Sequence, residues 1–490
     1  MKHALPGGRA MLAALIALTL AACAAPARLL APDLRGDVPL SGLQAPERAG
    51  WPAAQWWRQY HDPQLDNLMD SATRQSPDLA MAQSRVAQAE QSARLAAAQL
   101  GLSVNGSAQV ARQRLSDHGL IPSQFLGFSW YNQADLGAQL KYDFDWWGKK
   151  RATLEAALDQ AHAAEAQRSA AALALQYAVA DTYFGWQADQ ARLQLADQAL
   201  ATQQQFSRIA DLRVKQGVDL PDEAQKARAQ LAAVQEMRVA LEGSAKIRRV
   251  SLASLLGVAP EQLPELQPRP LPRVDEVIPA NAALDLIARR PDIAASRWQV
   301  EAALRQTDAA RAEFFPDFSI SAMAGLSSID LGKLFTAGSR TFSLAPALHL
   351  PIFNGGALKA NYGVSKAQLD AAIAQYDSTV LGAAREVATQ ALGAQQIAAR
   401  RVVQRTRVDA QRQLLANAQA RAAQGVRDAR ESLVAKAQWL QQRDAAVQLQ
   451  AQAVATDLAL VKALGGGYRD ASAADRNADA TSSVTAGARP

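Results

Sequence analysis

The sequence is poor in cysteine, in aromatic residues and in dense clusters of positive charge, and each shortage excludes a class of protein. A single cysteine among 490 residues excludes an internal disulfide framework and any zinc site built from several cysteines. No basic run with interleaved aromatic residues occurs, so nucleic acid is not expected as a partner. The chain is 49% hydrophobic, 20% charged and only 6% aromatic, with long stretches rich in alanine and glutamine. This composition argues against a wholly disordered chain and favours long helices.

Long hydrophobic runs are also missing, with one short exception near the start. Lys2 and Arg9 precede an apolar run at 10–22, which is shorter than the ~20 residues that a membrane-spanning helix needs. This layout is typical of a secretory signal, and residues 20–23 (LAAC) resemble the bacterial lipobox. The resemblance implies that Cys23 carries covalent lipid and, with Ala24 where an inner-membrane retention signal has aspartate, that the chain reaches the outer membrane. The alternative is an ordinary signal peptide with an incidental cysteine.

The chain contains an internal repeat. Residues 213–218 read RVKQGV and residues 421–426 read RAAQGV, and between the two copies residues 258–279 hold six prolines. So dense a proline segment excludes a helix and indicates an extended linker. We therefore predict a signal peptide at 1–22, an N-terminal anchor segment at 23–60, a first repeat at 61–257, a proline-rich linker at 258–279, a second repeat at 280–465 and a disordered tail at 466–490.

Each repeat is expected to contain two strands that alternate apolar and polar residues. The predicted strands cover about 102–113 and 134–146 in the first repeat and about 318–327 and 341–353 in the second. A soluble, half-buried sheet would explain the alternation, and so would a transmembrane barrel with an apolar outer face. Four strands cannot close a barrel, because the smallest transmembrane barrels have about eight. Several chains would therefore pool their strands, and three copies would supply twelve.

Each repeat is also expected to contain a very long helix and a shorter return helix. The long helices are predicted at 149–216 and 357–424 and the return helices at 221–256 and 427–464. A helix of that length extends ~100 Å and cannot be buried within one isolated globular domain. An ordinary core stripe is compatible with the spacing of their apolar residues, but the extreme length favours a bundle or a helical barrel.

Three segments give the sequence a specific resemblance. Residues 56–86, 142–157 and 350–368 resemble, in the same order along the chain, segments of the TolC-like outer-membrane factors of tripartite efflux systems. The chain is most similar to the lipoprotein branch of that family, the NodT family that includes OprM. The resemblance implies a mainly helical fold with a transmembrane β-barrel. A homotrimer would form a 12-stranded β-barrel, with four strands per chain, continuous with a long periplasmic α-helical barrel.

The same resemblance implies a function and partners. Drugs or other small toxic compounds would pass passively through the channel to the outside, delivered by an inner-membrane pump and a periplasmic adaptor of the membrane-fusion type. The partner pump is left open between the resistance-nodulation-division and major-facilitator types. The alternative function is a lipid-anchored, structural coiled-coil surface protein without transport.

Two glycines, Gly217 and Gly425, are predicted to form the turns at the far tips of the long helices, where a left-handed helix cap is needed. The family resemblance implies that charged residues just beyond them close the periplasmic end. The gate candidates by position are Asp222, Glu223, Arg427 and Glu431. The alternative is a pair of solvated helix ends whose charges contribute little, since exposed ion pairs are worth only ~0–1 kcal/mol.

Enzyme chemistry is not expected. The five histidines are scattered, with no pair at metal-ligand spacing, and no nucleophile elbow or P-loop occurs. We therefore predict no catalytic residues, no metal and no cofactor other than the covalent lipid at Cys23.

Overall fold

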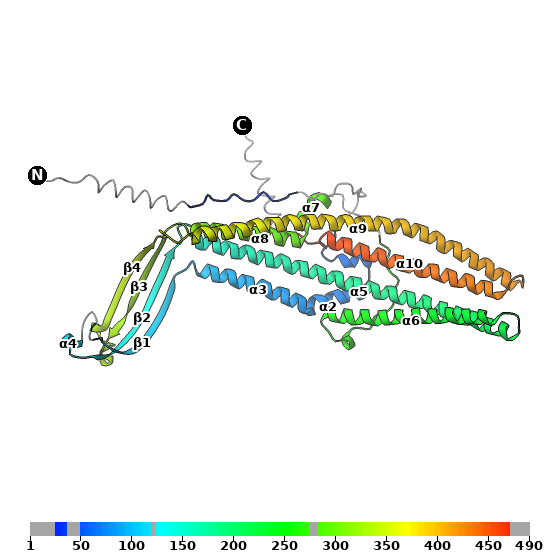
Figure 1. The fold of residues 1–490 in the computed structure, drawn as a ribbon, viewed down its shortest axis with the longest axis horizontal. Coiled ribbons are helices and arrows are strands. Elements are labelled where there is room, and N and C mark those ends of the chain that lie inside the picture. The colour runs from blue at the N-terminus through cyan, green and yellow to red at the C-terminus, as the bar shows by residue number, and fades with distance from the viewer. Residues whose placement is uncertain (1–24, 37–49, 117, 119–122, 275–281, 471–490) are drawn as a thin grey trace, which may run out of the picture. The chain divides into compact units, whose positions relative to one another are not determined.

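A computed structural model describes residues 25–36, 50–116, 118, 123–274 and 282–470. Cys23, the predicted signal peptide and most of the predicted tail lie outside the described residues. The described part is mainly helical, with one four-stranded sheet (Figure 1).

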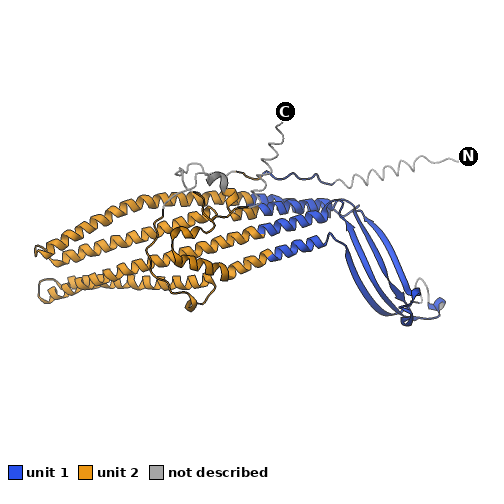
Figure 2. Cartoon of the chain, turned by 180° about the vertical axis from the view of Figure 1, so that it is seen from behind, with its two compact units in different colours: residues 1–33, 87–163, 297–375 blue, residues 34–86, 164–296, 376–490 orange. Residues whose placement is uncertain are grey.

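The chain forms two compact units (Figure 2). The first comprises residues 1–33, 87–163 and 297–375, and the second comprises residues 34–86, 164–296 and 376–490. Each unit therefore takes segments from both sequence repeats. The predicted division at residues 258–279 is a boundary between repeats and not between compact units, because strands from the two repeats pair in the same sheet.

The sheet belongs to the first unit and is antiparallel throughout, in the order β1-β2-β3-β4. Its strands are β1 (Ser103–Arg114), β2 (Trp130–Phe144), β3 (Asp317–Ser328) and β4 (Arg340–His349), with the short helix α4 (Ser123–Leu126) between the first two. Strand β2 of the first repeat pairs with β3 of the second, with Leu140 opposite Ala322. In a single chain β1 and β4 are the two edges of the sheet, and edge strands carry backbone groups that seek another partner.

Two strand boundaries differ from the sequence prediction by four residues, and the others differ by one or two. Strand β2 begins at Trp130 instead of 134, because Trp130 pairs with Arg114 at the end of β1. Strand β4 ends at His349 instead of 353, because its partner on β3, Asp317, is the first residue of that strand. The strands therefore end where pairing ends and not where the alternating pattern of the sequence ends.

One face of the sheet is apolar and exposed. Val104, Leu140, Ala322 and Leu344 are aligned in register across all four strands. Val104 is 62% exposed and Leu344 is 69% exposed. An apolar row of this extent on a soluble surface indicates contact with another apolar phase or another chain.

The helices account for most of the remaining described residues. Their bounds are α2 (Pro63–Gln75), α3 (Pro77–Ala98), α5 (Lys149–Lys215), α6 (Pro221–Leu256), α7 (Ala282–Arg289), α8 (Pro291–Ala312), α9 (Ala357–Ala423) and α10 (Ala429–Ala463). Short 3-10 turns lie at Trp56–Tyr60, Pro260–Gln262, Leu331–Lys333 and Ala337–Ser339. No described helix is both long enough and apolar enough to cross a membrane. Helix α10 begins two residues later than predicted, because Asp428 is its N-cap and accepts a hydrogen bond from the backbone N–H of Arg430.

The main core lies in the second unit and centres on the middle of α5. Val179, Tyr183 and Trp186 are buried there against apolar side chains of α2, α6 and α10. The hydroxyl of Tyr183 donates a hydrogen bond of 2.6 Å to Asp62, the N-cap of α2. Helix α5 therefore buries more than the single stripe that its sequence predicts, because several elements pack around it.

The proline-rich linker is held against this core by side-chain amides. Gln187 is 1% exposed; its Nε2 donates to the carbonyl of Gln267 at 3.1 Å, and its Oε1 accepts from the backbone N–H of Arg269 at 2.7 Å. Gln64 binds the N–H and the C=O of Gln267 in the same manner, at 2.7 and 3.0 Å. Side-chain amides thus replace a strand neighbour for the backbone groups of Gln267 and for the N–H of Arg269. The prediction of an extended linker omitted the 3-10 turn at Pro260–Gln262.

The single glycine inside α5 makes room for a charge pair between helices. A Cβ added at Gly185 would lie 2.5 Å from Cζ of Arg248, whose guanidinium reaches across from α6. The Nε of Arg248 lies 2.9 Å from the carboxylate of Asp189, which also accepts from the hydroxyl of Ser244 at 2.7 Å. The side chain of Asp189 is 8% exposed, so it depends on these partners.

We expect Gly185→Ala to lower the free energy of unfolding by about 1–2 kcal/mol. The added methyl group displaces Arg248 and leaves the carboxylate of Asp189 short of a partner, which costs about 1–3 kcal/mol and exceeds the gain of up to about 1 kcal/mol from alanine in a helix. Gly243→Ala on α6 is the matched control, because nothing lies within 4 Å of a Cβ there. Denaturant unfolding of both variants measures the difference. A Gly185→Ala protein as stable as the Gly243→Ala protein contradicts this explanation.

Candidate functional site

The candidate site lies in the second unit, at the tips of the two helix hairpins α5–α6 and α9–α10. Gly217 and Gly425 each have φ of 70°, in the left-handed region. Val218 N–H donates to the carbonyl of Arg213 at 2.9 Å, and Val426 N–H donates to that of Arg421 at 3.0 Å. These are the bonds of a Schellman cap, which ends a helix and reverses the chain. Any residue other than glycine would destabilise this left-handed conformation by roughly 1–2 kcal/mol, because its Cβ lies too close to the following carbonyl oxygen.

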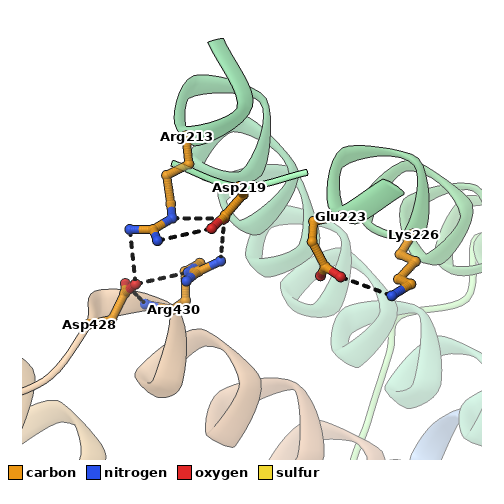
Figure 3. A network of polar contacts seen from close by, with 6 residues as sticks. All are labelled: Arg213, Asp219, Glu223, Lys226, Asp428 and Arg430. Carbon is orange, nitrogen blue, oxygen red and sulfur yellow. Dashed lines mark hydrogen bonds and ion pairs between the residues drawn. The ribbon is translucent and has the colours of Figure 1, made fainter. Parts of the chain in front are cut away.

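Four charged side chains join the two tips into one network (Figure 3). Arg213 binds Asp219 through two hydrogen bonds of 2.8 and 3.0 Å, within the first hairpin. Arg430 of the second hairpin donates to Asp219 at 2.9 Å and to Asp428 at 2.9 Å. The ring closes where Nη1 of Arg213 lies 3.6 Å from the carboxylate of Asp428. Charges of opposite sign alternate around the ring, so all four side chains have a partner of opposite charge on each side.

The two carboxylates of this network titrate below the ordinary range. Hydrogen bonds from Arg213 hold the pKa of Asp219 below its usual value of 3.8, and Arg430 lowers that pKa further. The pKa of Asp428 is lowered mainly by the hydrogen bond from the backbone N–H of Arg430 and then by the guanidinium of that residue. Hydrogen bonding to Asp219 raises the pKa of Arg213. These shifts favour the charged forms of Asp219, Asp428 and Arg213 at neutral pH.

The four residues selected from the sequence lie beside this network and are more exposed. Arg427, which precedes the N-cap of α10, forms a 3.5 Å pair with Glu431 in the first turn of that helix, and the two side chains are 62% and 43% exposed. Glu223 pairs with Lys226 at 2.9 Å on α6 (Figure 3), and Asp222 is exposed in the first turn of that helix. Within one chain, these contacts join residues of the same hairpin, whereas the network joins the two hairpins. Contacts of these residues between chains stay a prediction.

The sequence contains a signal for two network residues, Asp219 and Arg430, that are not among the gate candidates. When the two copies are aligned on their tip glycines, Asp219 falls at the position of Arg427, and Asp222 falls at the position of Arg430. Equivalent positions thus carry opposite charge in the two repeats. Only one member of each pair, Asp219 and Arg430, takes part in the link between hairpins.

The described tips carry no group of metal-ligating side chains. Within the described ranges no group of three or more histidine, cysteine, aspartate or glutamate side chains is placed to hold a metal ion. The site consists of ion pairs and helix caps, so it can hold two helix ends together.

Comparison with known proteins gives consistent matches across both repeats. Residues 68–258 and 283–466 match the family described as outer membrane efflux protein. The multidrug resistance outer membrane protein MdtP of Escherichia coli K12 is 36% identical over 428 residues, covering 86% of this chain and 88% of the relative.

Solved structures agree with this match. The outer membrane protein VceC of Vibrio cholerae is 30% identical, with a TM-score of 0.77, over 86% of this chain and 100% of that chain. The outer-membrane channel OprN is 26% identical, with a TM-score of 0.81, over 91% of this chain and 99% of that chain. The likeness therefore includes both the sheet and the long helices.

We expect the link between the hairpin tips to be lost only in acid. Because the folded pKa values of Asp219 and Asp428 are depressed, their contribution is present above pH 3.8 and disappears as pH falls through the lowered values. Spin labels at positions 218 and 426, in a Cys23→Ser background diluted with unlabelled chain, report the distance between tips. The distribution should be narrow at pH 7 and 5 and should broaden only as the pH is lowered below 3.8, through the depressed pKa values of the two carboxylates. An Asp219→Asn protein should give a broad distribution at every pH; a narrow one contradicts the role of the network.

Proposed function

The chain belongs to the outer membrane efflux protein family and is an outer-membrane efflux channel, and we propose that three copies of it form the exit duct of a tripartite efflux system. Drugs or other small toxic compounds pass through this duct passively, from a pump and a periplasmic adaptor to the outside. MdtP is a multidrug resistance protein, which supports this class of cargo.

The main support for a shared barrel is that the sheet of a single chain has two unpaired edges. Four strands leave β1 and β4 as open edges, and one face of the sheet is apolar and exposed. In a bilayer every backbone N–H and C=O must find a partner within the protein, so open edges are not tolerated there. Pairing β4 of one chain with β1 of the next satisfies both edges, and three chains give a barrel of twelve strands. A coiled-coil surface stalk without transport offers no reason for these two hairpins.

The tips supply the second part of the proposal, a closed periplasmic end. The network of Arg213, Asp219, Asp428 and Arg430 holds the two hairpins of one chain together. Arg427 and Glu431 are exposed beside it and available to a neighbouring copy. In the closed duct Arg427 pairs across the subunit boundary with Asp222 and Glu223, and Glu431 contributes to a ring of carboxylates.

A groove beside the network is the docking place for the adaptor. Its volume is about 510 Å³, and its lining combines Phe206, Leu414 and Val434 with the charged residues Arg421 and Glu431. An apolar floor with charged edges suits an amphipathic helix. A helix seated there lies against Arg430 and Glu431, so docking and gate opening are coupled through shared residues.

Lipid attachment at Cys23 completes the proposal. The lipobox-like residues 20–23 precede the first described residue, Ala25, by a few positions. Stable anchoring requires more than one acyl chain, which a lipoprotein cysteine carries. The lipid anchors the chain in the outer membrane alongside the barrel, and no further cofactor takes part. The type of inner-membrane pump is left open, because duct residues do not select the cargo.

We expect the purified protein to be a trimer that conducts ions. Native mass measurement in detergent should give three copies of the chain, and reconstitution in a planar bilayer should give discrete conductance steps. Deletion of the gene should raise the sensitivity of the cell to several toxic compounds, and the intact gene should restore resistance. A stable monomer rules out the shared barrel, and a trimer that conducts neither as the wild type nor as the Arg427→Ala variant supports the stalk instead.

We expect Arg427→Ala to open the channel more readily and Glu431→Gln to reduce its preference for cations. If each of three symmetry-related pairs holds about 0.5 kcal/mol, their loss raises the opening equilibrium about tenfold. A ring of carboxylates attracts cations, so its neutralisation lowers selectivity. Single-channel recording at low and high salt measures both effects.

The matched control for these variants is Lys246→Ala, which removes one exposed charge from α6 away from the tip. It should leave opening and selectivity unchanged. Wild-type behaviour of both tip variants at every salt concentration would show that these residues are ordinary surface charges.

A further inference from the structure

A pocket in the first unit has no role in the duct described above. It has a volume of about 440 Å³ and lies between the start of the described chain and the connection from β4 to α9. Its lining is largely apolar and includes Pro26, Phe314, Ile352, Phe353, Leu358 and Lys359. A volume of this size is within the usual range of small-molecule sites.

The N-terminal wall of the pocket is fixed to α8. The guanidinium of Arg311 donates a hydrogen bond of 2.6 Å to the carbonyl oxygen of Pro26. Two residues further on, Arg28 lies 3.7 Å from the carboxylate of Asp308 on the same helix. The chain segment that follows residue 23 is thus held at the pocket by contacts of its own.

The opposite wall exposes apolar side chains at the end of the sheet. Phe353 is 91% exposed and Ile352 is 60% exposed, just beyond the last residue of β4. Gly355 and Gly356, both in the left-handed region with φ of 60° and 89°, set the course of the connection behind them. Two large apolar side chains exposed together indicate a surface that takes an apolar partner.

We infer that this pocket seats one fatty acyl chain of the lipid carried by residue 23. The three-residue step from position 23 to Pro26 spans at most ~10 Å, so an acyl chain attached there starts within reach of the lining. So short a tether gives the chain a high effective concentration at the pocket, and burial of its methylene groups is favourable. This inference rests on the proposed lipidation of Cys23. The remaining acyl chains of the anchor enter the bilayer.

The test uses a fatty acid with a terminal diazirine, fed to cells that make the full-length protein. After irradiation, the protein is purified and digested with trypsin, and the peptide 341–359, which contains the far wall of the pocket, is examined for a cross-link to the N-terminal residue. We expect this intrachain cross-link in the wild type. Phe353→Ser should reduce its yield severalfold, and native mass measurement checks that the variant still assembles as the wild type does. Leu358→Gln should do the same, and Val364→Gln, an exposed α9 residue outside the lining, should not.

The other outcomes separate the sources of the acyl chain. Label on residue 23 without a cross-link to 341–359 overturns the pocket assignment and leaves the anchor intact. A cross-link that persists in a Cys23→Ser protein exported by a cleavable signal identifies phospholipid as the occupant and also overturns it. A cross-link between chains identifies a second copy as the occupant. Absence of label from residue 23 overturns the lipid anchor itself and the pocket assignment with it.

Discussion

The structure depends on the burial of two helices that are far too long to be stable alone. Backbone hydrogen bonds add little net stability to a solvated helix, so α5 and α9 need neighbours along their length. In the second unit α5 meets this need with Val179, Tyr183 and Trp186, which pack against α2, α6 and α10. The polar groups brought into that core are paired as well: Tyr183 with Asp62, Gln187 with the linker, and Asp189 with Arg248. These contacts fix the helices of a hairpin, and the position of its helices determines the position of the turn at its tip.

Much of this architecture was predictable because its signals are local. Helix α6 has the bounds expected from the sequence, since Pro221 suits the first helical position and Gly257 has the left-handed φ of a helix end. The strands were located by their alternation, but their ends were not, because pairing partners such as Arg114 and Trp130 decide where a strand stops. The family and its function followed from three segments in the right order. The enclosure of Arg248 beside Gly185 could not be predicted, because it requires knowledge of which face of α6 meets α5.

The limit of prediction from sequence is clearest at the tips of the two helix hairpins. Gly217 and Gly425 could be placed from a repeated QGV, but the link between hairpins joins Asp219 to Arg430, which are far apart in sequence and do not occupy equivalent positions in the two repeats. A repeat predicts similar residues at equivalent positions, whereas an ion pair requires two side chains of opposite charge. The two copies have therefore kept the same backbone turn and diverged in the sign of the charges beside it. That divergence places a carboxylate of one hairpin beside a guanidinium of the other.

The pairing of β2 with β3 also decides how the chain reaches its folded state. Each of the hairpins β1–β2 and β3–β4 closes over a short connection, but β2 and β3 are separated in sequence by α5, α6, the linker and α8. Contacts of low sequence separation form first, because less chain entropy is lost in closing a short loop. We therefore expect the two hairpins, each with two unpaired edges, to form before the joined sheet. Until β2 and β3 pair, each hairpin has two open edges that can act as templates for intermolecular strand pairing, so late closure of the sheet is the step most exposed to aggregation.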